Sequence, residues 1–233
     1  MEATRKSSKT LTNWIAYAMI GAIAFVIMKF EFPVMPGVTF LKMDFSDVVV
    51  VISTFIFGPV GGCAVAFIKS FVSLLFSGFA LPSLVGDLAA FLASMAFALP
   101  FYYIAGSVKE EDRKSLKGYL LPILGLVVGT ICLALVMSLA NAFVLTPVYA
   151  YTSVPQATSM HMNYGQLLSF TEKVYLGKML HIPSMSGYIF GIIAPFNLIK
   201  GAINSVVVYI LFESVLKTIK PFVVKHFSVS TRY

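Results

Sequence analysis

The stretch YLLPILGLVVGTICLALVMSLANAFVLTPVYAY, residues 119–151, runs for 33 residues without a charged side chain. A helix needs only about 20 apolar residues to cross the hydrocarbon core of a bilayer, so this run is long enough to project beyond it. Pro122 and Pro147 stand near its two ends, where we expect kinks. The stretch predicts that the chain is an integral membrane protein.

The composition of the whole chain agrees with this interpretation. Of 233 residues, 58% are hydrophobic and only 12% are charged, and the mean hydropathy is +0.88. A soluble domain carries about 25% charged residues. The composition therefore excludes a soluble enzyme and a disordered chain.

Five further apolar runs complete a predicted all-α fold. We predict six transmembrane helices in a single membrane domain, 1–233, with helices at about 11–30, 47–58, 60–79, 84–106, 118–150 and 188–217. The second is too short to span a bilayer and ends at Gly58-Pro59, so we expect a short, tilted or partly inserted helix. The segment at about 152–187 is expected to be an outer loop that covers a site, with a short surface helix within 166–180.

The positive charge is concentrated in three segments. The net charge is +7, and 11 of the 17 Lys and Arg residues lie before the first run, after the last run or in the loop at 106–117. Basic residues favour the cytoplasmic side of a membrane. This distribution predicts cytoplasmic N and C termini and an even number of crossings. It also gives the basic excess a role in orientation and not in binding nucleic acid.

Several polar side chains interrupt the apolar runs: Lys69, Asp87, Asn141, Asn197 and Lys200. A charge at membrane depth costs about 2.5–3.5 kcal/mol on insertion scales, so each charge needs a partner or a function. Lys69 and Asp87 have a structural alternative, an ion pair between two helices. Asn197 and Lys200 are three residues apart and share a helix face, where they form either a donor-rich site for carbonyl oxygens or a network that ties helices together.

The loop between the first two runs, Glu31–Asp47, combines prolines with aromatic and polar residues. Pro33 and Pro36 restrict its backbone, so we expect an ordered loop that offers the apolar surface of its aromatic, leucine and methionine side chains. The alternative is a simple connector in which Ser46 or Asp47 caps the next helix.

Small residues recur four positions apart, as in Ala18 with Ala22 and Gly125 with Gly129. This spacing places both members on one helix face and allows another backbone to approach closely. We expect the glycine pair to pack within the bundle. The first helix has few polar groups to bury, so Ala18 and Ala22 are expected to dock a partner helix.

Signatures of catalysis are absent from the sequence, which has no Walker phosphate loop, no Cys-x-x-Cys and no His-Glu-x-x-His. His161, His181 and His226 are scattered, so no metal site is predicted. We expect the chain not to be an enzyme, and any ATP hydrolysis must come from another subunit.

Five motifs, in order, resemble those of a known family. They are FLKMDFSD (40–47), FGPVGG (57–62), VGDLA (85–89), ANAFVLTP (140–147) and PFNLIKG (195–201). Over nearly its whole length, the chain resembles the riboflavin-specific substrate-binding subunits, or S components, of energy-coupling factor (ECF) vitamin transporters. The resemblance implies a high-affinity riboflavin-binding subunit for vitamin uptake, multi-pass in a bacterial cell membrane.

The resemblance also implies which residues bind the substrate: Phe40, Leu41, Met43, Asp44, Gly86, Asn141, Asn197 and Lys200. The asparagines and the lysine would hydrogen-bond the flavin ring, the first four residues would form a lid, and Gly86 would lie beside the ligand. Ala18 and Ala22 match the small-residue pattern that docks the membrane coupling subunit (T component), and two ATPase subunits would complete the transporter. Riboflavin would be cargo, with no cofactor.

Three alternatives stay open at this point. An S component for another vitamin or precursor, such as pantothenate or pyridoxine, would keep the fold without the flavin contacts. A small membrane enzyme acting on lipid or quinone would show turnover without an ATPase partner. A purely structural bundle would show no ligand affinity that depends on Asn197 and Lys200.

Overall fold

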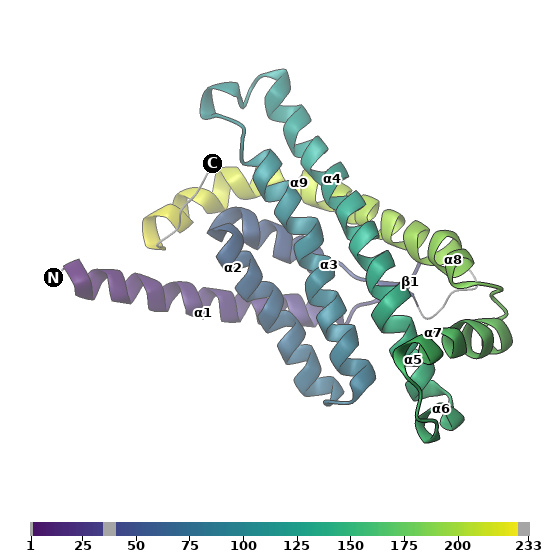
Figure 1. Ribbon diagram of the computed structural model, residues 1–233. Helices are drawn as coiled ribbons and strands as arrows, with labels where there is room; N and C mark the ends of the chain where they lie inside the picture. Colours follow the sequence, from purple (N-terminus) through teal and green to yellow (C-terminus); the bar gives the residue numbers. More distant parts are fainter. Residues whose placement is uncertain (1, 35–40, 228–233) are drawn as a thin grey trace.

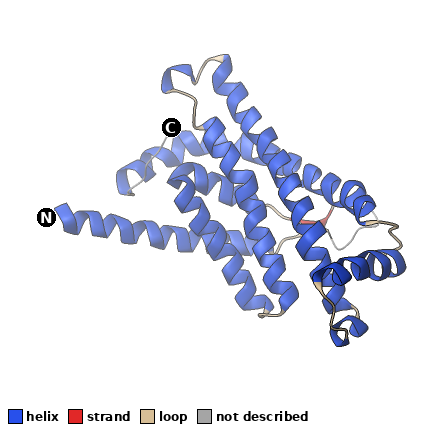
Figure 2. Cartoon of the chain, in the orientation of Figure 1, coloured by secondary structure: helices blue, strands red, loops and turns tan. Residues whose placement is uncertain are grey.

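The protein is almost entirely helical in the computed structural model, which describes residues 2–34 and 41–227 (Figures 1 and 2). The long helices are α1 (Glu2–Met28), α2 (Ser46–Ser77), α3 (Leu81–Ala105), α4 (Leu116–Ala140) and α9 (Ala194–His226). The short elements are β1 (Phe32–Pro33), β2 (Lys42–Met43), the 3-10 turn η1 (Glu110–Asp112), the π-helical η2 (Asn141–Leu145), η3 (Thr171–Met179) and η4 (Ile189–Ile193), and helices α5 (Thr146–Ser153), α6 (Pro155–Ser159), α7 (Tyr164–Phe170) and α8 (Met185–Tyr188).

Five helical stretches in the described ranges are long and apolar enough to cross a membrane. They are Thr10–Met28, Ser46–Ser77, Leu81–Ala105, Leu116–Ser153 and Met185–Phe212. The all-helical, multi-pass architecture expected from the sequence is therefore present. The number of stretches is five and not six because α2 covers both of the segments predicted at 47–58 and 60–79.

A kink divides α2 into two limbs. Gly58 has φ 80° and ψ 178°, a backbone conformation that is essentially restricted to glycine. Pro59 follows and lacks the N–H that a continuous helix requires. The Gly58-Pro59 break expected from the sequence is thus a sharp bend within one helix.

The helices pack in sequence order, and α9 closes the bundle against α4 and α2. The glycine pair expected to pack does so between α3 and α4: a Cβ on Gly129 would lie 2.6 Å from the carbonyl oxygen of Phe97. An aromatic core joins α2, α3 and α9, with the Phe55 and Phe212 ring centroids 4.6 Å apart. Figure 1 shows the first turns of α1 and the last turns of α9 on one side, and α5–α8 on the opposite side.

The loop after α1 and the segment after α5 meet on the side that carries α5–α8. The described ends of the loop pair as a short antiparallel hairpin, with Phe32 opposite Met43. The surface helix expected within 166–180 is present as most of α7 and the whole of η3. Leu176 of η3 is fully buried in a small cluster that includes Tyr188 and Leu41, so the two covering segments contact each other.

Candidate functional site

A cavity of about 520 Å³ lies between α3, the η2–α5 stretch and α9, beneath the hairpin and η3. Its volume is within the range of about 300–1,000 Å³ that is typical of small-molecule sites. Its walls mix apolar side chains with convergent polar ones: Met28, Glu31, Leu41, Lys42, Asp44, Gly86, Ala89, Ala90, Ala93, Met137, Asn141, Leu145, Thr146, Tyr149, Ser153, Tyr175, Tyr188, Phe196, Asn197 and Lys200.

Most of the residues singled out from the sequence line this cavity: Leu41, Asp44, Gly86, Asn141, Asn197 and Lys200. Met43, expected in the lid, is fully buried behind the wall and does not line the cavity. Phe40 lies outside the described residues. The structure therefore brings residues from distant parts of the chain to one site.

Two buried amides face the cavity from neighbouring helices. Asn141 Nδ2 donates to the carbonyl of Met137 at 2.9 Å, and Asn197 Nδ2 donates to that of Ile193 at 2.9 Å. These bonds fix both side chains. An amide has two N–H donors and an oxygen acceptor, so one such bond leaves a donor and the acceptor for a ligand.

The two amides stand at irregularities in their helices. Asn141 begins the π-helical η2, and Asn197 follows the π-helical η4 and Pro195. π-helical turns are rare in proteins overall, and those that occur are often found at functional sites, because they rotate side chains out of the regular register. The hydrophobic pattern gave no signal for these turns. Pro147 and Pro195, which lie close to them, did indicate a disturbed helix.

Lys200 is held by two carboxylates. Its Nζ lies 2.9 Å from Asp47 Oδ2 and 3.8 Å from Asp44 Oδ2. Asp44 belongs to the segment that leads out of the hairpin, and its Oδ1 accepts the backbone N–H of Ser46 at 2.7 Å, at the start of α2. The N-cap position of α2 is Phe45, so neither Ser46 nor Asp47 caps this helix, and Asp44 accepts the N–H of its first residue instead.

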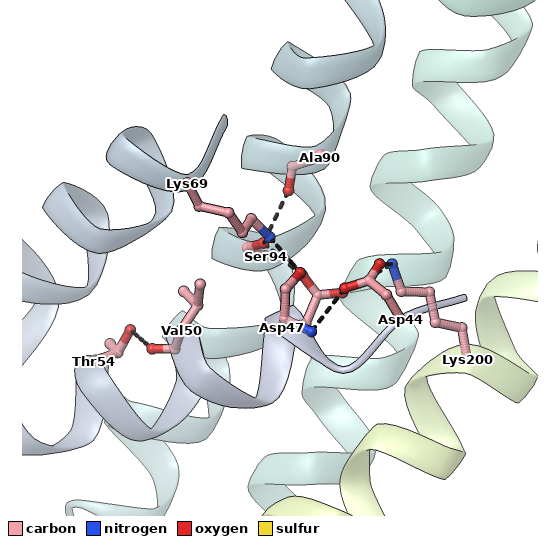
Figure 3. A network of polar contacts seen from close by, with 9 residues as sticks. Asp44, Asp47, Val50, Thr54, Lys69, Ala90, Ser94 and Lys200 are labelled. Atoms are coloured by element: carbon pink, nitrogen blue, oxygen red, sulfur yellow. Dashed lines mark hydrogen bonds and ion pairs between the residues drawn. The ribbon is translucent and has the colours of Figure 1, made fainter. Parts of the chain in front are cut away.

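Asp47 also joins Lys69 and Ser94 in a buried network (Figure 3). Asp47 Oδ1 accepts from Lys69 Nζ at 3.2 Å and from Ser94 Oγ at 2.6 Å. Lys69 Nζ also donates to Ser94 Oγ at 2.6 Å. The interpretation that Lys69 pairs with Asp87 is thus wrong. The reason is the kink at Gly58, which folds the second limb of α2 back beside its own first turn.

The network balances two lysines against two aspartates: Lys69 and Lys200 against Asp44 and Asp47. Buried charges are tolerated when they are paired and hydrogen-bonded, and uncompensated ones are expensive. Of these groups, Asp44 and Lys200 line the cavity, while Lys69, Asp47 and Ser94 lie behind it. The cavity wall is thus tied electrostatically to α2, α3 and α9.

Sequence reasoning missed a group of tyrosines in the cavity wall: Tyr149, Tyr175 and Tyr188. For Tyr149 a signal was present, since it follows Asn141 and Leu145 at four-residue spacing and so shares their helix face. Tyr175 had no such signal because its segment has no helical periodicity.

Ala18 and Ala22, the predicted docking pair, are exposed on α1, on a face they share with Ile15 and Met19. Only 22% of the membrane-spanning window of α1 is buried within the chain. The outer face of α1 is therefore available to lipid or to another helix.

Comparison with known proteins agrees with this architecture. The family described as "ECF transporter, substrate-specific component" matches residues 13–212. Riboflavin transporter RibU of Staphylococcus aureus (strain TCH60) is 33% identical over 206 residues, which cover 88% of this chain and 91% of the relative. Riboflavin transporter FmnP of Bacillus subtilis (strain 168) is 30% identical over 205 residues, with coverages of 85% and 88%.

A solved structure supports the same assignment. The S component of a bacterial ECF transporter matches this fold with a TM-score of 0.60 and 31% sequence identity, over 91% of this chain and 99% of the other. The family match, over residues 13–212, includes the helices that build the cavity. The chain belongs to the substrate-specific components of ECF transporters.

Proposed function

We propose that the protein binds riboflavin in the cavity and mediates its uptake as the S component of an ECF transporter. The observation that carries this proposal is the convergence of Asn141, Asn197 and Lys200 in one cavity of suitable volume. The riboflavin transporters that cover most of this chain, at 33% and 30% identity, support the choice of ligand.

Riboflavin has a flat ring system with one edge of carbonyl oxygens, ring nitrogens and an N–H. Two amides supply both donors and acceptors to such an edge, and the Lys200 ammonium supplies further donors. The flat faces need apolar walls, which Ala93, Met137 and Phe196 provide. Lys200 orients the ring more than it adds affinity, because desolvating its charge offsets much of the attraction.

The size of the ligand sets the scale of binding. Riboflavin has about 27 non-hydrogen atoms, which at roughly 0.3–0.45 kcal/mol each correspond to about −8 to −12 kcal/mol, or micromolar to nanomolar dissociation constants. Riboflavin is the cargo in this proposal, and the chain uses neither a cofactor nor a metal.

The transport cycle follows from the same parts. The hairpin closes over the bound vitamin, and Ala18 and Ala22 dock the T component. Two ATPase subunits of the ECF module supply the energy, since this chain has no Walker phosphate loop. Counting the two limbs of α2 separately, we propose six crossings, which put both termini on the same side of the bacterial cell membrane. The basic terminal segments favour the cytoplasm for that side, and the cavity is then on the outer side.

A flavin titration tests the proposal. Purified protein in detergent is expected to quench riboflavin fluorescence saturably, with a dissociation constant at or below the micromolar range, and to carry a yellow flavin absorption when purified from riboflavin-containing medium. A well-folded sample that gives neither signal would exclude riboflavin and direct the search to other vitamins.

A further inference from the structure

The cavity has two chemically different ends. Asn141 and Asn197 lie at one end, and Tyr149 and Tyr188 lie further along the same helical stretches. Tyr149 follows Asn141 by eight residues and Tyr188 precedes Asn197 by nine. With a rise of about 1.5 Å per residue, the amides and the tyrosines are roughly 12 Å apart along both stretches.

The tyrosine end is assembled from three elements. Tyr149 comes from α5, Tyr188 from α8 and Tyr175 from η3; all three line the cavity, and Tyr175 packs against the cluster that contains Tyr188. Gly86 of α3 leaves room for one of them, since a Cβ there would lie 3.3 Å from Tyr149 Oη. Burial raises the pKa of Tyr175, which keeps it a neutral phenol able to donate and accept.

The segment that carries Tyr175 is fixed in place at several points. Tyr164 Oη donates a hydrogen bond of 2.7 Å to the carbonyl of Phe143. This carbonyl is free to accept it because Pro147, one helical turn later, has no N–H to donate. Farther along, the backbone N–H of Met185 donates to Glu172 Oε1 at 3.0 Å.

Side chains fix the same segment from within. Asn163 and Gln166 form a reciprocal capping box at the start of α7, with both bonds 2.9 Å long. Leu176, next to Tyr175, is fully buried against Tyr188 and the hairpin residue Leu41. The segment is therefore a built wall of the cavity.

Phenol hydroxyls that line a cavity need hydrogen-bonding partners on a ligand that displaces water from them, because leaving such groups unpaired costs free energy. The hydrocarbon end of a flavin ring offers none. A chain of alcohol groups offers both donors and acceptors, as the three phenols and the neighbouring Ser153 require.

We propose that Tyr149, Tyr175 and Tyr188 form a subsite for a hydroxylated chain on the ligand, and that the outer segment 163–182 thereby determines substrate specificity. The proposal rests on the proposed function, in which the ligand is riboflavin with its ribityl chain. The amide end then hydrogen-bonds the ring edge, and the tyrosine end hydrogen-bonds the hydroxyl groups of the ribityl chain.

A pair of ligands separates the two ends. Lumiflavin has the same ring edge as riboflavin and a methyl group in place of the ribityl chain. Titrations of both flavins against wild type, Tyr175→Phe and Tyr149→Phe measure the contribution of each hydroxyl. Tyr151→Phe is the matched control, since Tyr151 also lies on α5 and is not among the described residues that line the cavity.

Loss of one neutral hydrogen bond is expected to weaken riboflavin binding by about three- to tenfold in each subsite variant. The lumiflavin dissociation constant of each subsite variant is expected to change by less than about twofold, because no hydrogen bond to this ligand is lost. Tyr151→Phe is expected to change the dissociation constants of both flavins by less than about twofold. Wild type is expected to bind riboflavin more tightly than lumiflavin.

If a variant weakens the binding of both flavins equally, or of neither, the polyol subsite is overturned. The proposed function, riboflavin binding in the cavity, would still stand. Failure of the wild type to bind either flavin would overturn the proposed function itself. Each variant removes one oxygen atom and keeps the ring, so both are expected to fold. Thermal melts of the detergent-solubilised proteins identify a variant that does not fold, and the other variant then tests the subsite.

Discussion

At the scale of single residues, the position of Asn197 beside Lys200 could be predicted from the sequence. Its spacing from Lys200 placed both on one helix face, and both line the cavity. Which lysine meets which aspartate was beyond such reasoning: Lys69 reaches Asp47, 22 positions earlier, only because α2 bends at Gly58. Helical spacing orders neighbours within an element, whereas ion-pair partners between segments depend on tertiary packing.

The first prediction concerns the Asn197 amide. Asn197→Ala leaves a polar group of the ring edge unpaired in a closed site, which costs about 1–3 kcal/mol and weakens riboflavin binding roughly five- to hundredfold. Fluorescence titration measures the change. Ser205→Ala on the same helix is the control, since this hydroxyl contacts Thr130 at 3.2 Å and lies outside the cavity. Unchanged affinity in Asn197→Ala would remove this residue from the site.

The second prediction concerns the charge network. Asp47→Asn leaves Lys69 and Lys200 with one carboxylate between them, and we expect a loss of about 3–5 kcal/mol of stability, as for other broken buried pairs. Lys69→Met leaves two carboxylates with one lysine and is expected to be similarly harmful. The double variant retains the neutral pair of Lys200 with Asp44.

A double-mutant cycle tests this network. The double variant is expected to be more stable than the sum of the two single losses, by about 0.5–3 kcal/mol of coupling. Melting of the solubilised protein gives the comparison. Additive losses would mean that Asp47 and Lys69 do not depend on each other.

At the scale of elements, the kink in α2 decides how the network forms. The Gly58-Pro59 break could be predicted from residue types, because proline and a flexible glycine together interrupt a helix. The π-helical turns could not, since one inserted residue changes register without changing composition. Those turns present Asn141 and help to place Asn197, so the finest details of the site were the least predictable.

The third prediction tests the kink. Gly58→Ala forces a side chain into a conformation that is nearly glycine-only, which is expected to cost about 1–3 kcal/mol. Gly191→Ala is the matched control, because a Cβ there meets nothing within 4 Å. Thermal melts of both variants give the comparison. Equal stability of the two would show that the bend tolerates a side chain.

At the scale of the whole molecule, the proposed binding site and the proposed docking surface lie on different parts of the chain. The cavity is enclosed by α3, η2–α5 and α9, whereas Ala18 and Ala22 lie on the exposed face of α1. Among the described side chains of α1, the cavity lining includes only Met28, the last residue of that helix. A change on the outer face of α1 should therefore leave riboflavin binding intact and disturb only the steps that need the rest of the transporter.

The fourth prediction separates these surfaces. Ala18→Trp with Ala22→Trp fills the close-approach face with two large rings, so we expect loss of cellular riboflavin uptake and of co-purification with the T component, with the flavin dissociation constant unchanged within about twofold. Leu135→Trp is the control, since this side chain is 59% exposed and lies on α4, which packs on α3 and α9 while α1 packs on α2. Normal uptake by the α1 variant, at normal membrane levels, would place the docking surface elsewhere. Because binding is measured on the same protein, lost docking is distinguished from a damaged cavity.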